Sequence, residues 1–256
     1  MTNQKYFLPR DYIENSGAMN SDENTDSHYW NKKRLSKSAD FQAHVYRRLA
    51  NLIAETNAKS MIDVGCGPAT KLRTIANQFK SLEIHGMDLK PAIDWCNENR
   101  DFGHWIAHDI QLPTRPDTIP QADLVVCADV LEHLDGPEKT VELLRSLLKP
   151  GGLAIISTPD RDRVMGTGAT TPSSSAHVRE WNFNEFSQFL TAHGANIVTH
   201  YHIWPSRIGP NRAFLGELLT HVRRHLWNLK STQVAIVKFD SQSPARSASG
   251  TPTRNS

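Results

Sequence analysis

The chain has 256 residues, of which 38% are hydrophobic and 22% are charged, and its formal net charge is +2. This length and composition predict one large globular domain with a substantial core, not two full domains. A nearly neutral charge argues against a dedicated nucleic-acid binder, and no apolar run is long enough to span a membrane.

The cysteines and the amino terminus indicate the compartment. The three cysteines, Cys66, Cys96 and Cys127, are widely spaced and form no CxxC pair. We therefore expect three reduced thiols and no metal-binding cysteine motif. The first residues contain no apolar stretch like that of a secretory signal. Together these features predict a cytoplasmic protein.

Hydrophobic periodicity predicts alternating strands and helices along most of the chain. Residues 1–39 are polar with scattered aromatic residues, which indicates a partly ordered N-terminal arm. A helix is expected next, over 40–56. The following elements are strands at 60–64, 82–88, 104–107, 122–128 and 153–158, and helices at 69–79, 91–99, 137–148 and 182–194.

The last third of the chain has a different pattern. Strands are expected at 196–204 and 231–239, with a possible helix at 212–229 between them. The alternation of strands and helices implies an α/β domain over 40–240, with a parallel sheet and right-handed crossovers. Residues 241–256 are rich in Ser, Pro and Arg and are expected to be a disordered tail.

A glycine turn follows the first predicted strand in "IDVGCGPA". Ligands of open parallel sheets bind beyond the carboxyl ends of the strands, where Gly65 and Gly67 stand. Glycine lets the backbone approach a ligand closely. The dinucleotide fingerprint G-x-G-x-x-G would need a third glycine at position 70, where this chain has Thr70. The turn therefore predicts a ligand site but disfavours a dinucleotide.

Acidic residues follow the next strands at the same edge. Asp88 ends the second strand, and an acidic residue there can accept hydrogen bonds from ribose hydroxyls. Asp109 follows the third strand in "AHDIQLP", where its carboxylate could bind an exocyclic amine. "CADVLEHL" leaves the fourth strand with Asp129, Glu132 and His133. This series predicts a nucleoside site.

Taken together, "IDVGCGPA", "GMDL", "HDI", "ADLVVCADVLEHL" and "LLKPGGLAIISTPD" resemble the successive motifs of the class I S-adenosylmethionine-dependent methyltransferases of the small-molecule type. The matches span about residues 60–160 in the family's order. The resemblance implies a Rossmann-like, doubly wound seven-stranded sheet, mostly parallel with an antiparallel last strand. It also implies S-adenosyl-L-methionine as cofactor. Ala69 stands where the family usually has a third glycine, a small departure.

The resemblance also implies roles for residues of the turn. Gly65 and Gly67 would pass under the methionine part of the cofactor. Asp63 would support the turn or bind the amino group. Cys66 would lie beside the cofactor as a small packing residue.

Further cofactor contacts are implied along the neighbouring strands. Asp88 would bind the ribose hydroxyls, with Leu89 against the adenine. Asp109 and Ile110 would hold the edge and the face of the adenine ring. The sulfonium and carboxylate side of the cofactor would be lined by Asp129 and Val130.

Two histidines are candidates for catalysis. Methyl transfer to an oxygen needs alignment of the reactants and removal of a proton, which a histidine can accept near pH 7. His133 is the first candidate, because it follows the fourth strand; a packing role is the alternative. His177 is the second and lies in a loop that could cover a substrate. Its alternative is a loop ion pair with Arg179 and Glu180.

A divalent metal bound by Glu132, His133 and His177 is a less favoured possibility. Adjacent residues on a helix point apart, which makes Glu132 and His133 poor co-ligands. We therefore predict no metal site.

The acceptor side has several open interpretations. Residues 159–175 form a long polar stretch that predicts a mobile loop over the site. Arg161, Arg163 and Arg179 could bind an anionic acceptor or be solvated surface charges. Tyr29 and Trp30 could cover the cofactor or anchor the arm. The apolar stripe of 212–230 favours a helix packed on the sheet edge, with a membrane-surface or dimer contact as the alternative.

The sequence therefore predicts a methyltransferase (EC 2.1.1.-) that O-methylates a saccharide or another hydroxylated small molecule. The absence of "NPPY" or "DPPY" after the fourth strand argues against amino-methylation of adenine or glutamine by the route that uses those motifs. A quinone- or lipid-linked O-methyltransferase is the second hypothesis. A nicotinamide-dependent oxidoreductase and a non-catalytic cofactor-binding module are the others.

Overall fold

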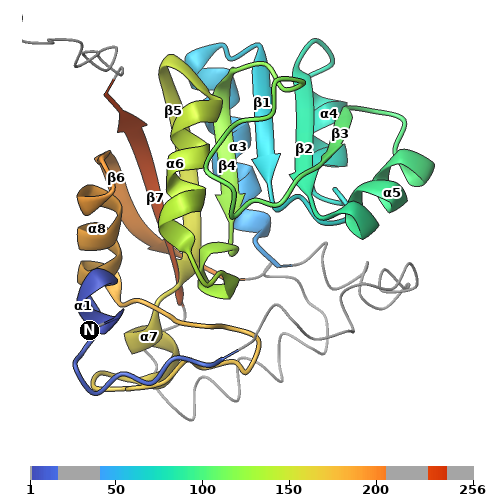
Figure 1. The fold of residues 1–256 in the computed structure, drawn as a ribbon. Helices are drawn as coiled ribbons and strands as arrows, with labels where there is room; N and C mark the ends of the chain where they lie inside the picture. The colour runs from blue at the N-terminus through green and yellow to red at the C-terminus, as the bar shows by residue number, and fades with distance from the viewer. Residues whose placement is uncertain (1, 17–40, 206–229, 241–256) are drawn as a thin grey trace, which may run out of the picture.

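The computed structural model describes residues 2–16, 41–205 and 230–240. Its centre is a seven-stranded sheet (Figure 1). The strands in chain order are β1 (Ser60–Val64), β2 (Glu83–Asp88), β3 (His104–Ala107), β4 (Ala122–Ala128), β5 (Leu148–Pro159), β6 (Ala195–Ile203) and β7 (Thr232–Phe239).

The spatial order of the strands is β3-β2-β1-β4-β5-β7-β6. Strands β1 to β5 pair in parallel, whereas β7 is antiparallel to both of its neighbours, β5 and β6. This arrangement confirms the predicted fold class, a doubly wound sheet with an antiparallel last strand.

Helices cover both faces of the sheet (Figure 1). They are α1 (Thr2–Lys5), α3 (Ala43–Thr56), α4 (Leu72–Gln78), α5 (Lys90–Asn99), α6 (Pro137–Leu147), α7 (Arg161–Met165) and α8 (Phe183–Ala192), and a 3₁₀ turn, η3, spans Leu131–His133. In the described segments, no helix has both the length and the apolar character that crossing a membrane requires.

The central strands alternate between two apolar cores because successive side chains of a strand point to opposite faces. In β1, Ile62 and Val64 pack with the core under α6 and α8. Met61 instead joins the core under α3, α4 and α5. Both faces of β4 are buried in the same way, which explains why its sequence, ADLVVCA, is almost continuously apolar.

The predicted helix at 69–79 is shorter in the structure and begins at Leu72. The reason is the preceding turn, in which Gly65, Gly67 and Ala69 have φ values of 78°, 52° and 52°. Left-handed residues cannot belong to a right-handed helix. The strand predicted at 153–158 is longer than expected, because β5 pairs with β4 from Leu148 onward.

One further sequence prediction needs correction, and three others concern residues that the structure does not describe. The expected mobile loop at 159–175 contains the short helix α7, which is held by a buried arginine described below. The possible helix at 212–229, Tyr29, Trp30 and the tail at 241–256 all lie outside the described residues.

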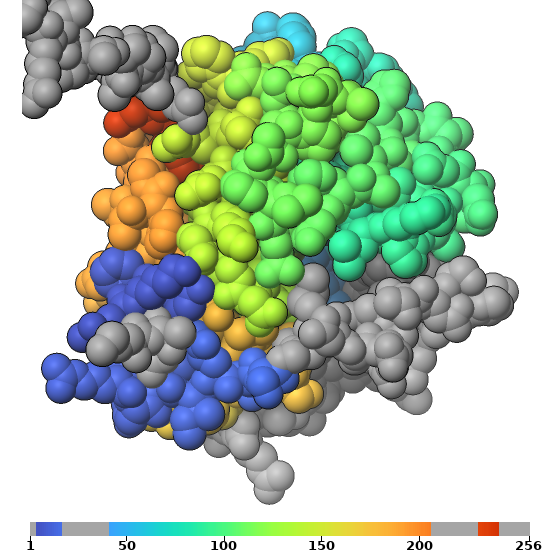
Figure 2. All heavy atoms as spheres, in the orientation of Figure 1, coloured from blue at the N-terminus to red at the C-terminus, as the bar shows by residue number. Residues whose placement is uncertain are grey.

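The N-terminal residues 2–16 pack on the domain near α8 and the chain before it (Figures 1 and 2). Tyr6, Leu8 and Tyr12 are buried there and belong to the core under α6 and α8.

The start of α8 is held by a buried ion pair. Asn182 and Glu185 form a capping box, each side chain accepting from the other's backbone N–H. Both Nη atoms of Arg161, on α7, donate to the Glu185 carboxylate at 2.7 Å. Since the Arg161 side chain is only 2% exposed, this pair fixes α7 against α8 in the interior.

We expect the substitution Glu185→Ala to lower the free energy of unfolding by about 3–5 kcal/mol, because it removes the bidentate partner of the buried Arg161 charge and leaves only the Asp162 carboxylate, at 3.6 Å. Urea denaturation measures this change. The control is Glu55→Ala, which breaks the exposed pair with Arg48 and should cost less than about 1 kcal/mol. Equal losses in the two variants would contradict the buried role of the Arg161–Glu185 pair.

Candidate active site at the carboxyl edge of the sheet

The glycine turn after β1 has a conformation that its sequence requires. Gly65 has φ +78°, and a Cβ atom added there would stand 2.5 Å from Cγ2 of Val130. The backbone N–H groups of Gly65 and Cys66 both donate to the carbonyl oxygen of Met87, at 2.8 and 3.2 Å. The turn is therefore folded back toward β2, and only glycine fits at position 65.

Asp88 ties this turn to the end of β2. One carboxylate oxygen accepts from the backbone N–H of Gly67 at 2.7 Å, and the other accepts from that of Leu89 at 2.7 Å. Burial raises the pKa of Asp88, although both hydrogen bonds favour its charged form. Asp88 thus shapes the turn as well as facing the predicted ribose position.

Asp63 is buried at the end of β1, just before the turn. The Tyr46 hydroxyl donates to its Oδ2 at 2.6 Å, whereas no hydrogen bond among the described residues reaches the buried Oδ1. Burial raises the pKa of Asp63 to about 7. The Lys71 ammonium donates to Gln42 at 2.7 Å and stands over the Tyr46 ring. The unsatisfied Asp63 oxygen is a ready acceptor for a ligand's amino group.

The predicted adenine contacts lie after β2 and β3. Leu89 is 40% exposed although it is apolar, so its side chain is available to a flat ring. Asp109 is exposed, and its Oδ1 accepts the backbone N–H of Gln111 at 3.0 Å. Ile110 is buried in the core. Its backbone oxygen accepts a bond from the Thr140 hydroxyl at 2.9 Å, which fixes Ile110 at the predicted adenine position.

Asp129 leaves β4 in a left-handed conformation with φ 53°. Its Oδ1 accepts from the Ser157 hydroxyl at 2.6 Å, and its backbone N–H donates to the backbone oxygen of Ser157 at 3.0 Å. Burial raises the pKa of Asp129. Val130 follows and packs against Gly65, so the ends of β1, β4 and β5 meet at one point.

The two candidate histidines lie together. Their rings are 4.7 Å apart between centroids and nearly perpendicular, at 85°. His133 Nδ1 lies 2.8 Å from the backbone oxygen of Ala176, which can only accept, so Nδ1 carries the proton. His177 Nδ1 bonds to the buried Glu180 carboxylate. The Nε2 atom of either ring bears a lone pair whenever that ring is neutral.

The environments of the two histidines differ. Burial, together with the nearby His177, lowers the pKa of His133 to about 4, so His133 is neutral at physiological pH. His177 instead has a carboxylate partner, and Glu180 is held in turn by the hydroxyl of Ser173 at 2.6 Å and its backbone N–H at 3.1 Å. A histidine oriented by a buried carboxylate is the usual arrangement of a general base.

The objection to a metal ligand set does not hold in the structure. Glu132 and His133 lie on the 3₁₀ turn η3, and each of Glu132, His133 and His177 offers a ligand atom within 4.8 Å of the others. Glu132 is fully buried, and no described residue bonds to its Oε1. Burial raises its pKa well above the ordinary range. These three side chains could hold a divalent cation after small movements.

Two of the three predicted anion-binding arginines, Arg161 and Arg179, are used inside the protein, whereas Arg163 donates to the backbone oxygen of Lys230 at 3.1 Å. Arg161 pairs with Glu185, as described above. Arg179 is buried, donates to Glu14 at 2.6 Å and to the backbone oxygen of Leu134 at 2.7 Å. These two guanidinium groups therefore hold the structure together and do not face an acceptor.

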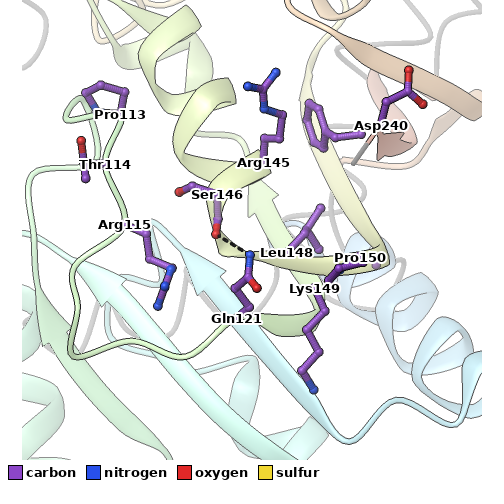
Figure 3. Close-up of a pocket in the computed structure, with 12 residues that line it drawn as sticks. Pro113, Thr114, Arg115, Gln121, Arg145, Ser146, Leu148, Lys149, Pro150 and Asp240 are labelled. Carbon is purple, nitrogen blue, oxygen red and sulfur yellow. Dashed lines mark hydrogen bonds between the residues drawn. The ribbon is translucent and has the colours of Figure 1, made fainter. Parts of the chain in front are cut away.

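A pocket of about 550 Å³ lies at the opposite edge of the sheet (Figure 3). It is formed where β4 and β5 begin, and Arg115, Arg145 and Lys149 are among its lining residues. Arg115 bonds to the backbone of Ile119, and Lys149 pairs with Asp123 at 2.9 Å. The pocket is far from the residues that the strand ends bring together, and it is not part of the candidate active site.

A family model described as a methyltransferase domain matches residues 39–207. The chain belongs to the methyltransferase domain family. This membership confirms the predicted class I S-adenosylmethionine-dependent methyltransferase and sets aside a nicotinamide-dependent enzyme. It does not identify the acceptor.

Named relatives include O-methyltransferases. The chain is 30% identical over 145 residues to the malonyl-[acyl-carrier protein] O-methyltransferase of Halalkalibacterium halodurans, covering 50% of this chain and 54% of that protein. It is 32% identical over 108 residues to the ubiquinone biosynthesis O-methyltransferase of Azoarcus sp., and this match covers 41% of this chain and 46% of that protein. The chain thus spans about half the length of the curated relatives it matches.

A solved structure has the same fold over almost its whole length. The plantazolicin methyltransferase BamL, in complex with S-adenosylhomocysteine (SAH) and a triazolic desmethylPZN analog, is 16% identical and superposes with a TM-score of 0.62. The superposition covers 93% of this chain and 98% of that one.

The methyltransferase's cofactor is S-adenosyl-L-methionine, and the residues at the carboxyl edge fit it. Gly65 and Gly67 have no side chains of their own to keep a ligand away from the backbone of the turn. Asp63 offers an unsatisfied oxygen to an amino group. Each Asp88 oxygen has one bond in place and can accept another from a ribose hydroxyl.

Several contributors to the methyltransferase site could not be assigned from the sequence. Tyr46 lies on α3, before the first motif, and nothing in its helical pattern distinguishes it from a core residue. Ser157 is a polar residue at the end of an apolar strand, which was a usable signal. Glu180 stands three residues after His177 and was expected only as part of a loop ion pair; the structure does pair it with His177.

We expect Asp88→Asn to weaken SAH binding about ten- to a hundredfold, because it removes a charge-assisted acceptor and loosens the Gly67 turn. Calorimetric titration measures this. Asp94→Asn, on the exposed face of α5, is the matched control and should bind like the wild type. Wild-type affinity in Asp88→Asn would remove Asp88 from the cofactor site.

The raised pKa of Asp63 predicts a pH-dependent stability. Between about pH 4 and pH 7 the folded protein keeps the proton that the unfolded chain has lost, so the free energy of unfolding falls as pH rises through this window. Asp63→Asn stays neutral and should remove this fall, making the variant more stable than the wild type at pH 8 by up to about 4 kcal/mol. Urea denaturation of both proteins at pH 5 and pH 8 tests it. If the free energy of unfolding changes equally in the two proteins between pH 5 and pH 8, Asp63 is not protonated in the folded protein.

Proposed function

We propose that this methyltransferase transfers a methyl group to an oxygen of a hydroxylated small molecule. The observation that carries the proposal is the pair of histidines beyond β4, of which His177 is oriented by the buried Glu180. O-methylation requires a base to remove the acceptor's proton, whereas an acceptor without such a proton needs only alignment. The relatives named as O-methyltransferases support the same assignment.

In the proposed mechanism His177 Nε2 accepts the hydroxyl proton. S-adenosylmethionine supplies an electrophilic methyl group on a positively charged sulfur. Glu180 holds the ring through Nδ1 and stabilises the imidazolium that forms. His133, neutral and fixed by Ala176, packs edge to face against the His177 ring and holds that ring in place.

Our first candidate acceptor is a saccharide or another aliphatic hydroxyl compound. A quinone-type phenol or a lipid-linked acceptor is the second candidate, favoured by the relative named as a ubiquinone biosynthesis O-methyltransferase. A membrane-surface contact through residues 212–230 would suit that acceptor, but 212–229 lie outside the described residues. We expect no nucleic-acid partner, and we propose the cytoplasm as its location.

A panel of saccharides, hydroxy acids, catechols and hydroxylated quinones, assayed with radiolabelled methyl donor, tests the proposal. With the best acceptor, we expect His177→Ala to lower kcat by about 10²–10⁴-fold and Glu180→Gln to lower it less, since one lacks the base and the other only its partner. His104→Gln, an exposed histidine on β3, is the matched control.

The metal alternative is tested in the same assay. The base mechanism predicts that EDTA leaves kcat unchanged. Loss of activity in EDTA, restored by added Mg²⁺ or Mn²⁺, would instead assign Glu132, His133 and His177 to a cation. SAH binding without turnover on any acceptor would favour a non-catalytic module.

A further inference from the structure

The N-terminal segment, residues 6–15, is bound along the loop that carries His177. Its backbone N–H groups at Ile13 and Asn15 donate to the backbone oxygens of Thr170 and Val178, at 2.7 and 3.0 Å. Figure 1 shows the two stretches side by side beneath α8. The loop lies between α7 and α8, so these bonds supply the pairing that a strand or helix would otherwise give it.

Asn15 is hydrogen-bonded to the turn that contains His177. Its side-chain amide donates to the backbone oxygen of Ser174 at 3.1 Å and to that of His177 at 2.8 Å. The backbone N–H of His177 also bonds to Ser174, at 3.1 Å, which closes the turn. One side chain, 162 positions before His177, therefore holds both ends of the turn.

Two aromatic residues of the segment hold the Glu180 end of the loop. The buried Tyr12 hydroxyl accepts the backbone N–H of Glu180 at 2.9 Å. The backbone oxygen of Tyr6 accepts the indole N–H of the fully buried Trp181 at 3.0 Å. The Arg179 guanidinium lies 4.0 Å from the Tyr6 ring centroid and pairs with Glu14.

The inner side of the loop is attached to the end of β4. The backbone N–H of Val178 donates to the backbone oxygen of Glu132 at 2.7 Å, next to His133. The loop is thus held between the fourth-strand motif on one side and the N-terminal segment on the other. A base must be positioned to within a fraction of an ångström, and the bonds from the N-terminal segment restrain the loop on the side that the inner contacts do not reach.

We propose that Asn15 and Tyr12 are positioning residues of the acceptor site, which fix the His177–Glu180 pair through the backbone of its loop. The N-terminal segment is then part of the methyltransferase's working site and not an accessory arm. This inference rests on the proposed role of His177 as the base, but its structural part can be measured independently.

The full-length variants Asn15→Ala and Tyr12→Phe test the proposal, with Asp11→Asn, an exposed change on the same segment, as the control. Hydrogen exchange should show the amides of His177 and Val178 opening about tenfold faster in each variant, since each loses a bond to the loop. ¹⁵N-histidine NMR should show loss of the single Nδ1-protonated form of His177. SAH binding should stay within twofold of the wild type.

The outcomes distinguish the positioning role of Asn15 and Tyr12 from the role of His177 as the base. With the best acceptor, supporting results are faster exchange, loss of the His177 signature and a kcat at least fivefold lower at unchanged SAH affinity. Unchanged exchange and an unchanged His177 signal in both variants would overturn the proposal. If the signature and exchange change while both these variants and His177→Ala keep full activity, the loop positioning stands and the base assignment fails.

Discussion

The site depends on the hydrogen bonds that Asp88 makes between the glycine turn and the end of β2. One carboxylate fixes the Gly67 and Leu89 N–H groups, and the backbone oxygen of Met87 holds the two preceding N–H groups. Gly65 can take its left-handed conformation next to Val130 only because it has no Cβ atom, which would collide with the Val130 side chain. The β1, β2 and β4 ends are thus joined before any ligand is present.

The buried carboxyl groups at the carboxyl edge of the sheet differ in how many hydrogen bonds they accept. Asp63 and Glu132 each keep one oxygen without a bond among the described residues, and burial raises the pKa of both. Glu180 is equally buried but accepts bonds from Ser173 and His177. An incompletely bonded buried carboxyl is costly to the fold, which is why such groups concentrate where a ligand completes them. Asp63 fits this description at the cofactor side.

The acceptor side is built from parts that are distant in the chain. Residues 170–181 have little regular structure, and their backbone is bonded on one side to Glu132 and on the other to the N-terminal segment. Two of the three arginines that were expected to bind an anion, Arg161 and Arg179, form buried ion pairs in this assembly. Their charges are unavailable to a substrate because each is held by a carboxylate and by backbone oxygens.

The sequence by itself determined the fold and the cofactor edge. The β1 and β4 strands are buried on both faces, which requires continuous apolar runs. The motifs that follow the strands are local, so each strand carries its own motif to the carboxyl edge of the sheet. Only the tertiary structure decided the partners. It paired Tyr46 with Asp63, brought Glu132 beside both histidines, and used Asn15 to hold the His177 turn. Such contacts join side chains from separate elements and depend on packing, which no local pattern encodes.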